Sequence, residues 1–499
     1  MTGQVSLVRI SDLRISTNEE SYVFHIYHTA RLFVSGSMEV ETSLSKPDLA
    51  VLADRPMNVI RIQDRSSGRE REYPGTDKES CKRAVFSFLS EWTGQRIPWG
   101  TLIGVRPTKL VLTALTAGRS EPAIRAQLLE RYLVTEEKLD LAIRVAKTEQ
   151  KLLQGWQDGR IGIYLDMPFC PTKCFYCSFL SYPSANQAAM ARYEEALLQD
   201  IQRTGELLKT LGLEPGYLYF GGGTPTSGSA ESLRRILTAA IQTFRSASPM
   251  TEFTVEAGRP DTITPEKLSL MKELGVTRLS INPQTFCDRT LQSMGRTHTG
   301  RDIEACLDQA RSLNFESINM DLILGLPGES VAEAAASIRR ACALGPENIT
   351  IHGLALKKGA SLTQVDSQIR DRVSAMYRIV YDELARAGYE PYYLYRNKNT
   401  LGNLENVGFT RGDHASRYNI AMIEETDTIA ACGASGITRV VTGAAGESGS
   451  PLLLRHNGYK DLELYLRSLN ESLAAKAGVL SRARERLDLS ERPDSYYND

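Results

Sequence analysis

The stretch Tyr164-Leu-Asp-Met-Pro-Phe-Cys170-Pro-Thr-Lys-Cys174-Phe-Tyr-Cys177 places three cysteines on one short segment, with the spacing C-x3-C-x2-C. Three thiolates on one loop can hold three corners of a cubane iron–sulfur cluster and leave the fourth iron open to a small molecule. A closed structural zinc site needs a fourth Cys or His at comparable spacing, and none lies nearby. The spacing therefore favours an open iron–sulfur site over three unrelated thiols.

A regular alternation of strand-like and helical segments begins at residue 160, just before this motif. The expected strands are residues 161–165, 217–220, 253–255, 278–281, 318–323 and 349–354. The expected helices between them are residues 188–211, 230–244, 265–274, 301–313 and 331–344. Because a parallel strand must be reached by a crossover, the pattern predicts right-handed parallel βα units. Six such units form an open, partial barrel, whose chemistry gathers at the carboxyl ends of the strands.

Composition and charge exclude several classes of protein. The chain has 499 residues, 42% hydrophobic and 24% charged, with a formal net charge of −1, as in a globular protein of two or three domains. This balance gives no overall field for nucleic acid or an anionic membrane. The sequence contains no apolar run of membrane-spanning length and no N-terminal secretion signal. The other five cysteines, Cys81, Cys287, Cys306, Cys342 and Cys432, are scattered singly, which predicts a reducing, cytoplasmic location.

The regions on either side of the barrel differ from it. Residues 1–155 are expected to form an N-terminal α+β domain, with strand-like runs at 22–27 and 59–62, helices at 77–91, 121–131 and 136–153, and a loop at 97–109. The barrel is assigned to residues 156–360, and residues 361–499 to a C-terminal α+β extension on the substrate side. That extension contains an expected helix at 366–388, a Tyr-rich run at 389–396, Gly-rich segments at 399–408 and 430–436, and a frayed tail at 491–499.

Polar or glycine-rich residues follow each later strand. The second strand leads into Phe220-Gly-Gly-Gly-Thr-Pro-Thr226, whose glycines let the backbone come close to a ligand. The next ends carry Glu256, then Ser280-Ile-Asn-Pro-Gln284 with Arg296 and His298 downstream, then Asp321, and finally His352 and Ala355. Each feature alone has an ordinary structural alternative, such as a tight turn, a surface carboxylate or a hydrogen-bonded histidine. Because these features follow successive strands of one predicted sheet, we interpret them as parts of a single site.

Together these motifs resemble the radical S-adenosylmethionine superfamily and, within it, the oxygen-independent coproporphyrinogen III dehydrogenases and their relatives. The resemblance covers residues 160–440 or so. The N-terminal extension with Gly104-Val-Arg-Pro-Thr-Lys109 and the run Met-Pro-Phe-Cys-Pro-Thr are similar to the HemZ-like branch. The resemblance implies a partial (β/α)6 radical-SAM barrel between an N-terminal α+β domain and a C-terminal α+β extension.

The resemblance also implies the cofactors and the residues that hold them. Cys170, Cys174 and Cys177 match the ligands of a [4Fe–4S] cluster, and the amine and carboxylate of S-adenosylmethionine chelate the open iron in the family. The residues that match the family's contacts to this cosubstrate are Tyr164, Tyr176, Gly222, Gly223, Thr224, Glu256, Gln284, Arg296, Asp321 and Ala355. No catalytic side chain is assigned, and neither is a second S-adenosylmethionine site.

The implied reaction is the oxidative decarboxylation of coproporphyrinogen III in haem biosynthesis. A 5′-deoxyadenosyl radical takes a hydrogen from a propionate β-carbon, loss of CO₂ and one electron leaves a vinyl group, and two rounds give protoporphyrinogen IX. The partners implied are this tetrapyrrole and a reduced electron donor such as flavodoxin or ferredoxin, with no nucleic acid. The substrate is a tetra-anion, for which the basic candidates at the barrel mouth are Lys357, Lys358, Arg396, Lys398, Arg411 and Arg417.

Three departures from the family pattern leave the substrate open. Ser178-Phe179 follow the last cluster cysteine where the dehydrogenases have a fourth cysteine, and this is similar to the haem-chaperone branch. Asp166 replaces a histidine at the first strand end, and Asn282 replaces a glycine of the fourth. None of these changes removes a cluster ligand. The alternatives are a haem-binding, chaperone-like relative that keeps the cluster and another radical reaction on a tetrapyrrole.

Overall fold

The computed structural model describes residues 10–103, 106–156, 158–179, 181–357, 360–362, 369–397, 399–445 and 451–483. The chain divides into two compact units, one of residues 1–147 with 396–405 and one of residues 148–395 with 406–499. Each unit has its own sheet. The expected domain boundaries at 155/156 and 360/361 stay predictions. Gly104, Val105, Lys358, Lys398 and the tail 491–499 lie outside the described residues.

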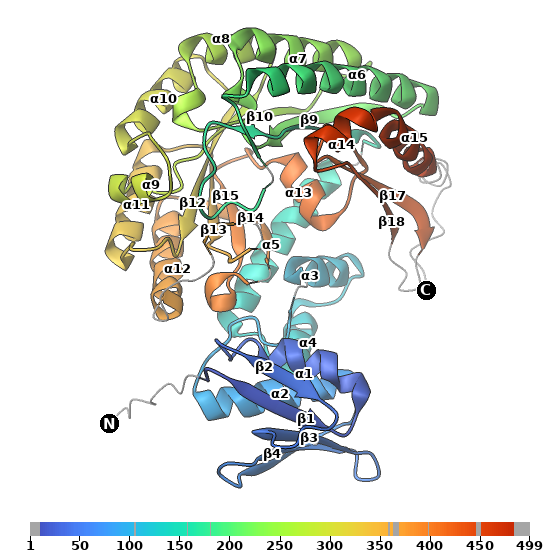
Figure 1. Cartoon of the computed structure of the whole chain (residues 1–499), viewed down its shortest axis with the longest axis vertical. Helices are drawn as coiled ribbons and strands as arrows, with labels where there is room; N and C mark the ends of the chain where they lie inside the picture. The colour runs from blue at the N-terminus through green and yellow to red at the C-terminus, as the bar shows by residue number, and fades with distance from the viewer. Residues whose placement is uncertain are drawn as a thin grey trace. The chain divides into compact units, whose positions relative to one another are not determined.

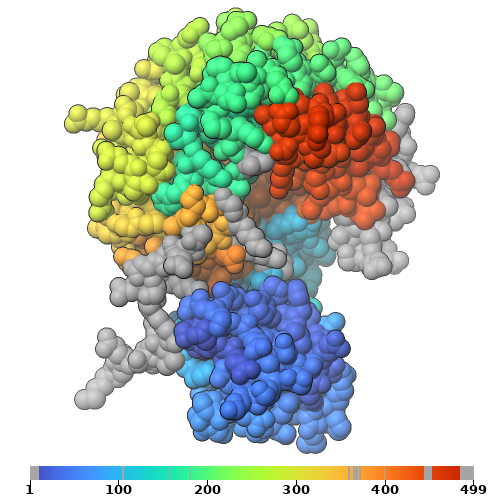
Figure 2. Space-filling view, viewed as in Figure 1, coloured from blue at the N-terminus to red at the C-terminus, as the bar shows by residue number. Residues whose placement is uncertain are grey.

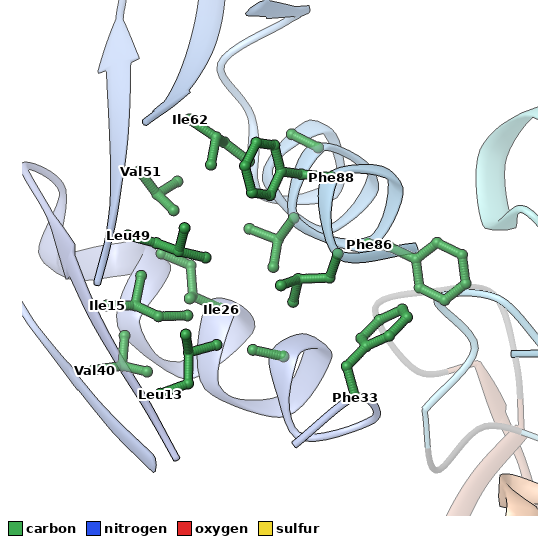
Figure 3. Close-up of a cluster of buried hydrophobic side chains, with 14 of the residues drawn as sticks. Leu13, Ile15, Ile26, Phe33, Val40, Leu49, Val51, Ile62, Phe86 and Phe88 are labelled. Atoms are coloured by element: carbon green, nitrogen blue, oxygen red, sulfur yellow. The ribbon is translucent and has the colours of Figure 1, made fainter. Parts of the chain in front are cut away.

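The first unit is built on a five-stranded sheet with the order β2-β1-β3-β4-β5. The strands are β1 (Leu13–Thr17), β2 (Met38–Glu41), β3 (Leu49–Asp54), β4 (Val59–Asp64) and β5 (Glu70–Pro74). Strand β1 runs parallel to β2 and β3, and β3, β4 and β5 pair antiparallel. Apolar side chains from the sheet meet those of helices α1 (Val23–Ala30) and α2 (Lys78–Thr93), as Figure 3 shows for Ile15, Leu49, Ile26 and Phe88. The expected strand at 59–62 and helix at 77–91 are confirmed by β4 and α2.

The expected strand at residues 22–27 is wrong, because helix α1 occupies this position. Its aromatic and β-branched composition favours a strand. The buried residues Tyr22, Ile26 and Ala30 are spaced four apart and share one face of a helix, whereas Phe24 and Tyr27 are 66% and 39% exposed. Packing against the sheet therefore decides the local structure in place of β propensity.

Three further helices complete the first unit: α3 (Pro107–Thr116), α4 (Glu121–Tyr132) and the beginning of α5 (Glu136–Gly155). The last two confirm the helices expected at 121–131 and 136–153, whereas α3 was not expected. A buried ion pair fixes residue Glu405 in this unit: its carboxylate lies 2.9 Å from Lys138 Nζ and accepts a 2.7 Å hydrogen bond from Trp99 Nε1. Removing one partner of such a buried pair typically costs about 3–5 kcal/mol.

The second unit is built on an eleven-stranded sheet in the order β14-β15-β13-β12-β11-β10-β9-β6-β16-β17-β18. The six expected strands are confirmed as parallel neighbours: β6 (Ile161–Met167), β9 (Pro215–Gly222), β10 (Glu252–Gly258), β11 (Arg278–Ile281), β12 (Ser317–Leu324) and β13 (Asn348–Gly353). The five expected helices are confirmed as α6 (Gln187–Leu211), α7 (Ala230–Thr243), α8 (Pro265–Glu273), α10 (Gly300–Ser312) and α11 (Val331–Leu344). Figure 1 shows them outside the curved sheet. The arrangement is the expected partial barrel.

The sheet continues beyond the six strands on both sides. On one side β16 (Ile429–Cys432) pairs parallel with β6, and β17 (Ile437–Ala445) and β18 (Pro451–Asn457) follow antiparallel. On the other side β15 (Asn406–Thr410) pairs antiparallel with β13, and β14 (Glu390–Tyr395) pairs with β15. Strand β16 is thus a further parallel strand beside the six, which its short sequence, Ile-Ala-Ala-Cys, did not predict. The remaining helices are α9 (Asp288–Ser293), α12 (Ile369–Arg386), α13 (Arg417–Glu424), α14 (Leu462–Arg467) and α15 (Leu469–Leu480).

A buried polar network joins the C-terminal helices to the barrel. Asp200 on α6 accepts hydrogen bonds from Lys476 of α15, from Tyr465 OH of α14 at 3.0 Å and from the backbone N–H of Gly433 at 3.0 Å. Figure 2 shows this C-terminal segment, in red, against the green surface of α6. The loop after β16 is thereby held beside the end of β6. Within the described part of the chain, no helix is long and apolar enough to cross a membrane.

Glu149 on α5 gives a test of the second unit's electrostatics. It is fully buried, and neither carboxylate oxygen has a hydrogen-bond partner among the described residues. Burial, and then the charge of Glu424, raise the pKa of Glu149 well above its ordinary value. Since the folded-state pKa exceeds the unfolded one, stability is lost as the pH rises through the folded-state value.

We therefore expect Glu149→Gln to change the thermal unfolding temperature little near pH 4 and to raise it at pH 8. The increase in the free energy of unfolding at pH 8 should be on the order of 1–3 kcal/mol. Thermal unfolding followed by circular dichroism at both pH values measures this difference. The exposed Glu214→Gln is the matched control. Equal unfolding temperatures for Glu149→Gln and the natural chain at pH 8 would show that no buried charge opposes folding there.

Candidate functional site

The three cysteines lie on a loop that follows β6, at the carboxyl edge of the parallel sheet. Its first residues, Phe169–Cys170, form the short strand β7 and pair with β8 (Tyr182–Pro183), which closes the loop at its base. Cys174 is 8% exposed, and its carbonyl accepts a 3.0 Å hydrogen bond from the N–H of Cys177 in a turn. Thr172 Oγ1 donates to the carbonyl of Gly295 at 2.9 Å, which ties the loop to the segment after α9.

The glycines at the carboxyl end of β9 let the neighbouring strands approach closely. A Cβ atom on Gly223 would lie 2.7 Å from the carbonyl oxygen of Phe169 and 3.0 Å from Cys170 Sγ. A Cβ on Gly221 would lie 2.9 Å from Glu256 Oε2, and Gly222 has a φ of 108° with Asp166 Oδ1 against it. Only glycine fits these positions without a shift of its neighbours. The glycine run therefore places Cys170 and Glu256 on either side of one short segment.

Thr224, directly after the glycines, also contacts the cluster loop. Its Oγ1 lies 3.4 Å from Cys170 Sγ, and the residue is 2% exposed. Burial raises the pKa of the Cys170 thiol, and the hydrogen bond with Thr224 acts against this rise. Burial likewise raises the pKa of Cys177. The thiols are thus sheltered from solvent, and a metal centre has to displace their protons.

The carboxylates of the buried Asp166 and the half-buried Glu256 lie beside the glycine run. Burial raises the pKa of Glu256 to about 7, although Tyr219 OH donates a hydrogen bond to the carboxylate. Burial raises the pKa of Asp166 to about 6, against hydrogen bonds from the N–H of Ser435 at 3.2 Å and from Tyr164 OH at 3.3 Å. This region favours a positively charged ligand, whose charge would keep both carboxylates ionised.

Asp321, within β12, differs from these two carboxylates. Burial acts to raise its pKa, but His352, 3.6 Å away through Nε2, and Asn319, which donates at 2.7 Å, lower it overall. The backbone N–H of Gln284 donates to the carbonyl of Asp321 at 2.8 Å, and Gln284 adopts a φ of 67°. A left-handed backbone at a residue other than glycine is strained and is found most often at functional sites.

Arg296 brings a buried positive charge to the other side of the loop. It is 7% exposed, donates to the carbonyl of Asn282 at 2.8 Å and donates to Tyr176 OH at 3.3 Å. Among the described residues its Nε has no hydrogen-bond partner. Ala355, after β13, is 7% exposed. Hydrogen bonds and close approaches thus link the residues that were expected to contact the cosubstrate, with the exception of Ala355. Ala355 shares with them only its place at the same edge of the sheet.

Two of the basic candidates for the tetrapyrrole lie at the opposite edge of the sheet. Arg417 donates twice to Asp158 at 2.8 Å, and Arg411 donates to the carbonyl of Gly345 at 2.7 Å, so both lie beyond the amino ends of the strands. Arg396 belongs to the first unit, where it donates to Leu102 and Asn403 carbonyls and covers the Trp99 ring. The expected place of Arg411 and Arg417 at the barrel mouth is wrong, because their partners lie at the opposite edge of the sheet. The place expected for Arg396 stays a prediction. Lys357 stays a candidate, exposed and near Cys177.

One residue at the site was missed by the sequence analysis. Arg259, after β10, is 4% exposed and donates through Nη1 to the carbonyl oxygen and the hydroxyl of Thr172, at 3.1 and 2.9 Å. It lies three residues after Glu256 in the segment Glu256-Ala-Gly-Arg-Pro260, where only the carboxylate had been considered. A charged residue between glycine and proline at a strand end was the available signal.

The donor set fits a cluster better than a single metal ion. The three cysteines are free thiols and interact electrostatically with one another. Among the described residues, no three Cys, His, Asp or Glu side chains converge so as to hold one metal ion. In a cubane each thiolate binds a different iron, so its ligands need not converge on one point. The loop therefore suits a [4Fe–4S] cluster with three protein ligands.

Comparison with known proteins agrees with this chemistry. Residues 164–341 match the radical SAM superfamily. The chain is 37% identical over 380 residues to the oxygen-independent coproporphyrinogen-III oxidase-like protein HemZ of Bacillus subtilis (strain 168), which covers 73% of this chain and 76% of HemZ. It is 33% identical over 239 residues to the heme chaperone HemW of the same bacterium, covering 46% of this chain and 61% of HemW.

Two further relatives extend the comparison. The oxygen-independent coproporphyrinogen III oxidase of Cereibacter sphaeroides (strain ATCC 17025 / ATH 2.4.3) is 32% identical over 195 residues, covering 39% of this chain and 42% of that protein. The structure of coproporphyrinogen III oxidase (HemN) from Escherichia coli, a radical SAM enzyme, superposes with a TM-score of 0.51 at 21% identity and covers 65% of this chain and 73% of that chain. This structural likeness supports the fold.

We expect Gly223→Ala to reduce cluster uptake while the fold persists, because its Cβ would press on Cys170 Sγ and on two carbonyl oxygens of the loop. Iron and sulfide per chain after anaerobic reconstitution measure the effect, and circular dichroism reports the fold. Gly478→Ala in α15, where a Cβ has open space, is the matched control. A Gly223→Ala protein with the full iron content would contradict the close approach.

Proposed function

The chain belongs to the radical SAM superfamily and, within it, to the family that contains HemZ, and on this premise we propose that it catalyses the oxygen-independent oxidative decarboxylation of coproporphyrinogen III. Members of the superfamily use a [4Fe–4S] cluster and S-adenosylmethionine. When bound, the cluster supplies the electron that cleaves S-adenosylmethionine to methionine and a 5′-deoxyadenosyl radical. Each of two substrate propionates would give a hydrogen atom to this radical, which becomes 5′-deoxyadenosine. Each would then lose CO₂ and pass one electron to an external one-electron acceptor, which leaves a vinyl group and gives protoporphyrinogen IX.

One observation supports this proposal most directly: the glycine run at the carboxyl end of β9 has Cys170 on one side and Glu256 on the other. Cys170, Cys174 and Cys177 would hold the cluster. Glu256 would then be placed to accept hydrogen bonds from a ligand bound at the open iron. S-adenosylmethionine is a cation at its sulfonium centre, which suits a site lined by buried carboxylates.

The remaining expected contacts suit other parts of the same cosubstrate. Arg296, buried and with an unpartnered Nε among the described residues, would bind the carboxylate of the methionine moiety. Gly222 and Gly223 leave room for the backbone to contact it, and Thr224 would fix the sulfur of Cys170. Tyr164, Tyr176, Gln284, Asp321 and Ala355 are proposed contacts by their place at the same edge of the sheet.

The substrate and the other partners are also part of the proposal. Lys357 would attract the propionates of a tetra-anionic tetrapyrrole, since it is exposed near Cys177. An exposed ion pair contributes only about 0–1 kcal/mol, so affinity requires that substrate binding exclude water from this contact. A small reduced electron carrier such as flavodoxin or ferredoxin would supply the electrons, in the cytoplasm.

A second candidate function is haem binding and transfer, with the cluster retained. The exposed Phe179, 63% accessible two residues after Cys177, favours it, because a flat macrocycle can stack on an aromatic ring. The absence of a fourth cysteine at Ser178-Phe179 and the similarity to HemW are consistent with this reading. It predicts stoichiometric haem binding without formation of vinyl groups.

An anaerobic assay separates the two candidates. The reconstituted protein is mixed with dithionite, S-adenosylmethionine and coproporphyrinogen III, and protoporphyrin fluorescence is followed beside 5′-deoxyadenosine by chromatography. We expect both products to rise together. Deoxyadenosine without a vinyl product would assign the radical chemistry to another substrate. Neither product from a fully loaded cluster, together with tight haem binding, would contradict the decarboxylase proposal.

The pKa of Glu256 gives a test of cosubstrate binding. Because burial raises it to about 7, the ionised form that attracts a cation grows as the pH rises toward 7. In the family the amine of S-adenosylmethionine binds the open iron and has to lose its own proton, so affinity rises with pH below about 7.7–8.0 in the natural chain and in Glu256→Gln alike. We expect the contribution of Glu256, measured as the ratio of the affinity of the natural chain to that of Glu256→Gln, to increase by roughly tenfold between pH 5.5 and 7.

Glu256→Gln should bind more weakly than the natural chain at pH 7 and with nearly the same affinity as the natural chain at pH 5.5. Anaerobic titration calorimetry measures the affinities, and Glu316→Gln, exposed before β12, is the matched control. An unchanged pH profile in Glu256→Gln would remove Glu256 from the binding site.

A further inference from the structure

A buried arginine outside the expected site contacts the cysteine loop. Arg259 follows β10 and is 4% exposed. Its Nε and Nη2 donate to the two oxygens of Asp261 at 3.0 and 2.9 Å, which fixes the plane of the guanidinium. Thr297 Oγ1 donates to the same carboxylate at 3.2 Å. The remaining nitrogen, Nη1, is thereby directed away from Asp261.

Nη1 faces the cluster loop. It donates to the carbonyl oxygen of Thr172 at 3.1 Å and to its hydroxyl at 2.9 Å, and it lies 4.0 Å from the sulfur of Cys174. Thr172 is the residue midway between Cys170 and Cys174, so one side chain determines the course of the backbone between two ligands. The guanidinium also presents its positive edge to one ligand sulfur, while its carboxylate partner contacts the opposite edge.

The other groups around this contact do not cancel it. Arg296 adds a second positive charge, since it also interacts with Cys174. His298, whose Nδ1 lies 3.9 Å from Asp261, is neutral near pH 7 because burial and then Arg296 lower its pKa to about 4. Asp261 is the acidic partner, and it contacts the nitrogens that point away from the sulfur. The charge nearest to Cys174 is therefore positive.

We propose that Arg259 is a positioning residue that fixes the cluster loop through Thr172 and raises the reduction potential of the cluster through its charge beside Cys174. Donors and positive charge next to a ligand sulfur stabilise the reduced, more negative form of an iron–sulfur cluster. The step concerned is the entry of one electron from an external reductant, with no bond made or broken and no proton transferred. The inference depends on the cluster and not on the identity of the tetrapyrrole.

The decisive variants are Arg259→Met, which removes the charge and the donors, and Arg259→Lys, which keeps the charge but not the planar fork. Arg289→Met is the matched control, because Arg289 is 67% exposed and pairs with Glu333 at 2.9 Å. Each protein is reconstituted anaerobically, its iron and sulfide are measured, and the cluster is titrated with dithionite under electron paramagnetic resonance without S-adenosylmethionine or tetrapyrrole.

At the potential where the natural protein is half reduced, we expect the reduced-to-oxidised ratio in Arg259→Met to fall about tenfold, which equals 59 mV for a one-electron couple. The reduced-to-oxidised ratio of Arg259→Lys should lie between those of the natural protein and Arg259→Met, and the ratio of Arg289→Met should equal that of the natural protein. An Arg259→Met protein with full iron content and an unchanged potential would overturn the proposal. If the protein binds a cluster but does not decarboxylate coproporphyrinogen III, the same ratios are expected. The proposal for Arg259 can therefore be contradicted independently of the proposed function.

A second measurement applies if Arg259→Met takes up too little iron for a titration. Hydrogen exchange of the metal-free protein reports the loop directly. We expect faster exchange in the peptide that contains residues 170–177 for Arg259→Met, with Arg289→Met unchanged. Loss of iron without faster exchange in that peptide would contradict the positioning role.

Discussion

Parallel strands end at the same edge of a sheet, and every residue of the candidate site depends on this constraint. Strands β6, β9, β10, β11, β12 and β13 run in one direction, so the segments that follow them meet although they are far apart in the sequence. The glycine run of residues 221–223, at the carboxyl end of β9, brings these segments closer still, because it has no Cβ atoms to press on Cys170 on one side or on Glu256 of β10 on the other. Without both features, the thiols and the carboxylate would not share a site.

Charged side chains of both signs lie at this edge of the sheet. Asp166 and Glu256 are buried carboxylates with raised pKa values, which suits a cationic ligand. Arg259 and Arg296 lie on the side of the loop that contains Cys174. The carboxylates of Asp166 and Glu256 thus lie beside the glycine run, whereas the two guanidinium groups lie near Cys174.

Most of this architecture could be predicted from the sequence, since buried parallel strands and amphipathic helices leave strong periodic patterns. The cysteine spacing and the strand-end motifs likewise predicted where the site lies. The predictions that were wrong or missing concern features that depend on tertiary contacts. Helix α1 has strand-like composition but buries Tyr22 and Ile26 on one face, and β16 is too short to show a pattern. Arg411 and Arg417 look like free cations in the sequence, whereas their partners come from distant segments.

In the proposed site, three cysteines hold three irons of the cluster and leave the fourth open for S-adenosylmethionine. Anaerobic Mössbauer spectroscopy of the protein reconstituted with ⁵⁷Fe measures this arrangement. We expect four irons per chain, of which one changes its isomer shift and quadrupole splitting when S-adenosylmethionine is added while three stay unchanged. A spectrum in which no iron responds to S-adenosylmethionine would contradict it.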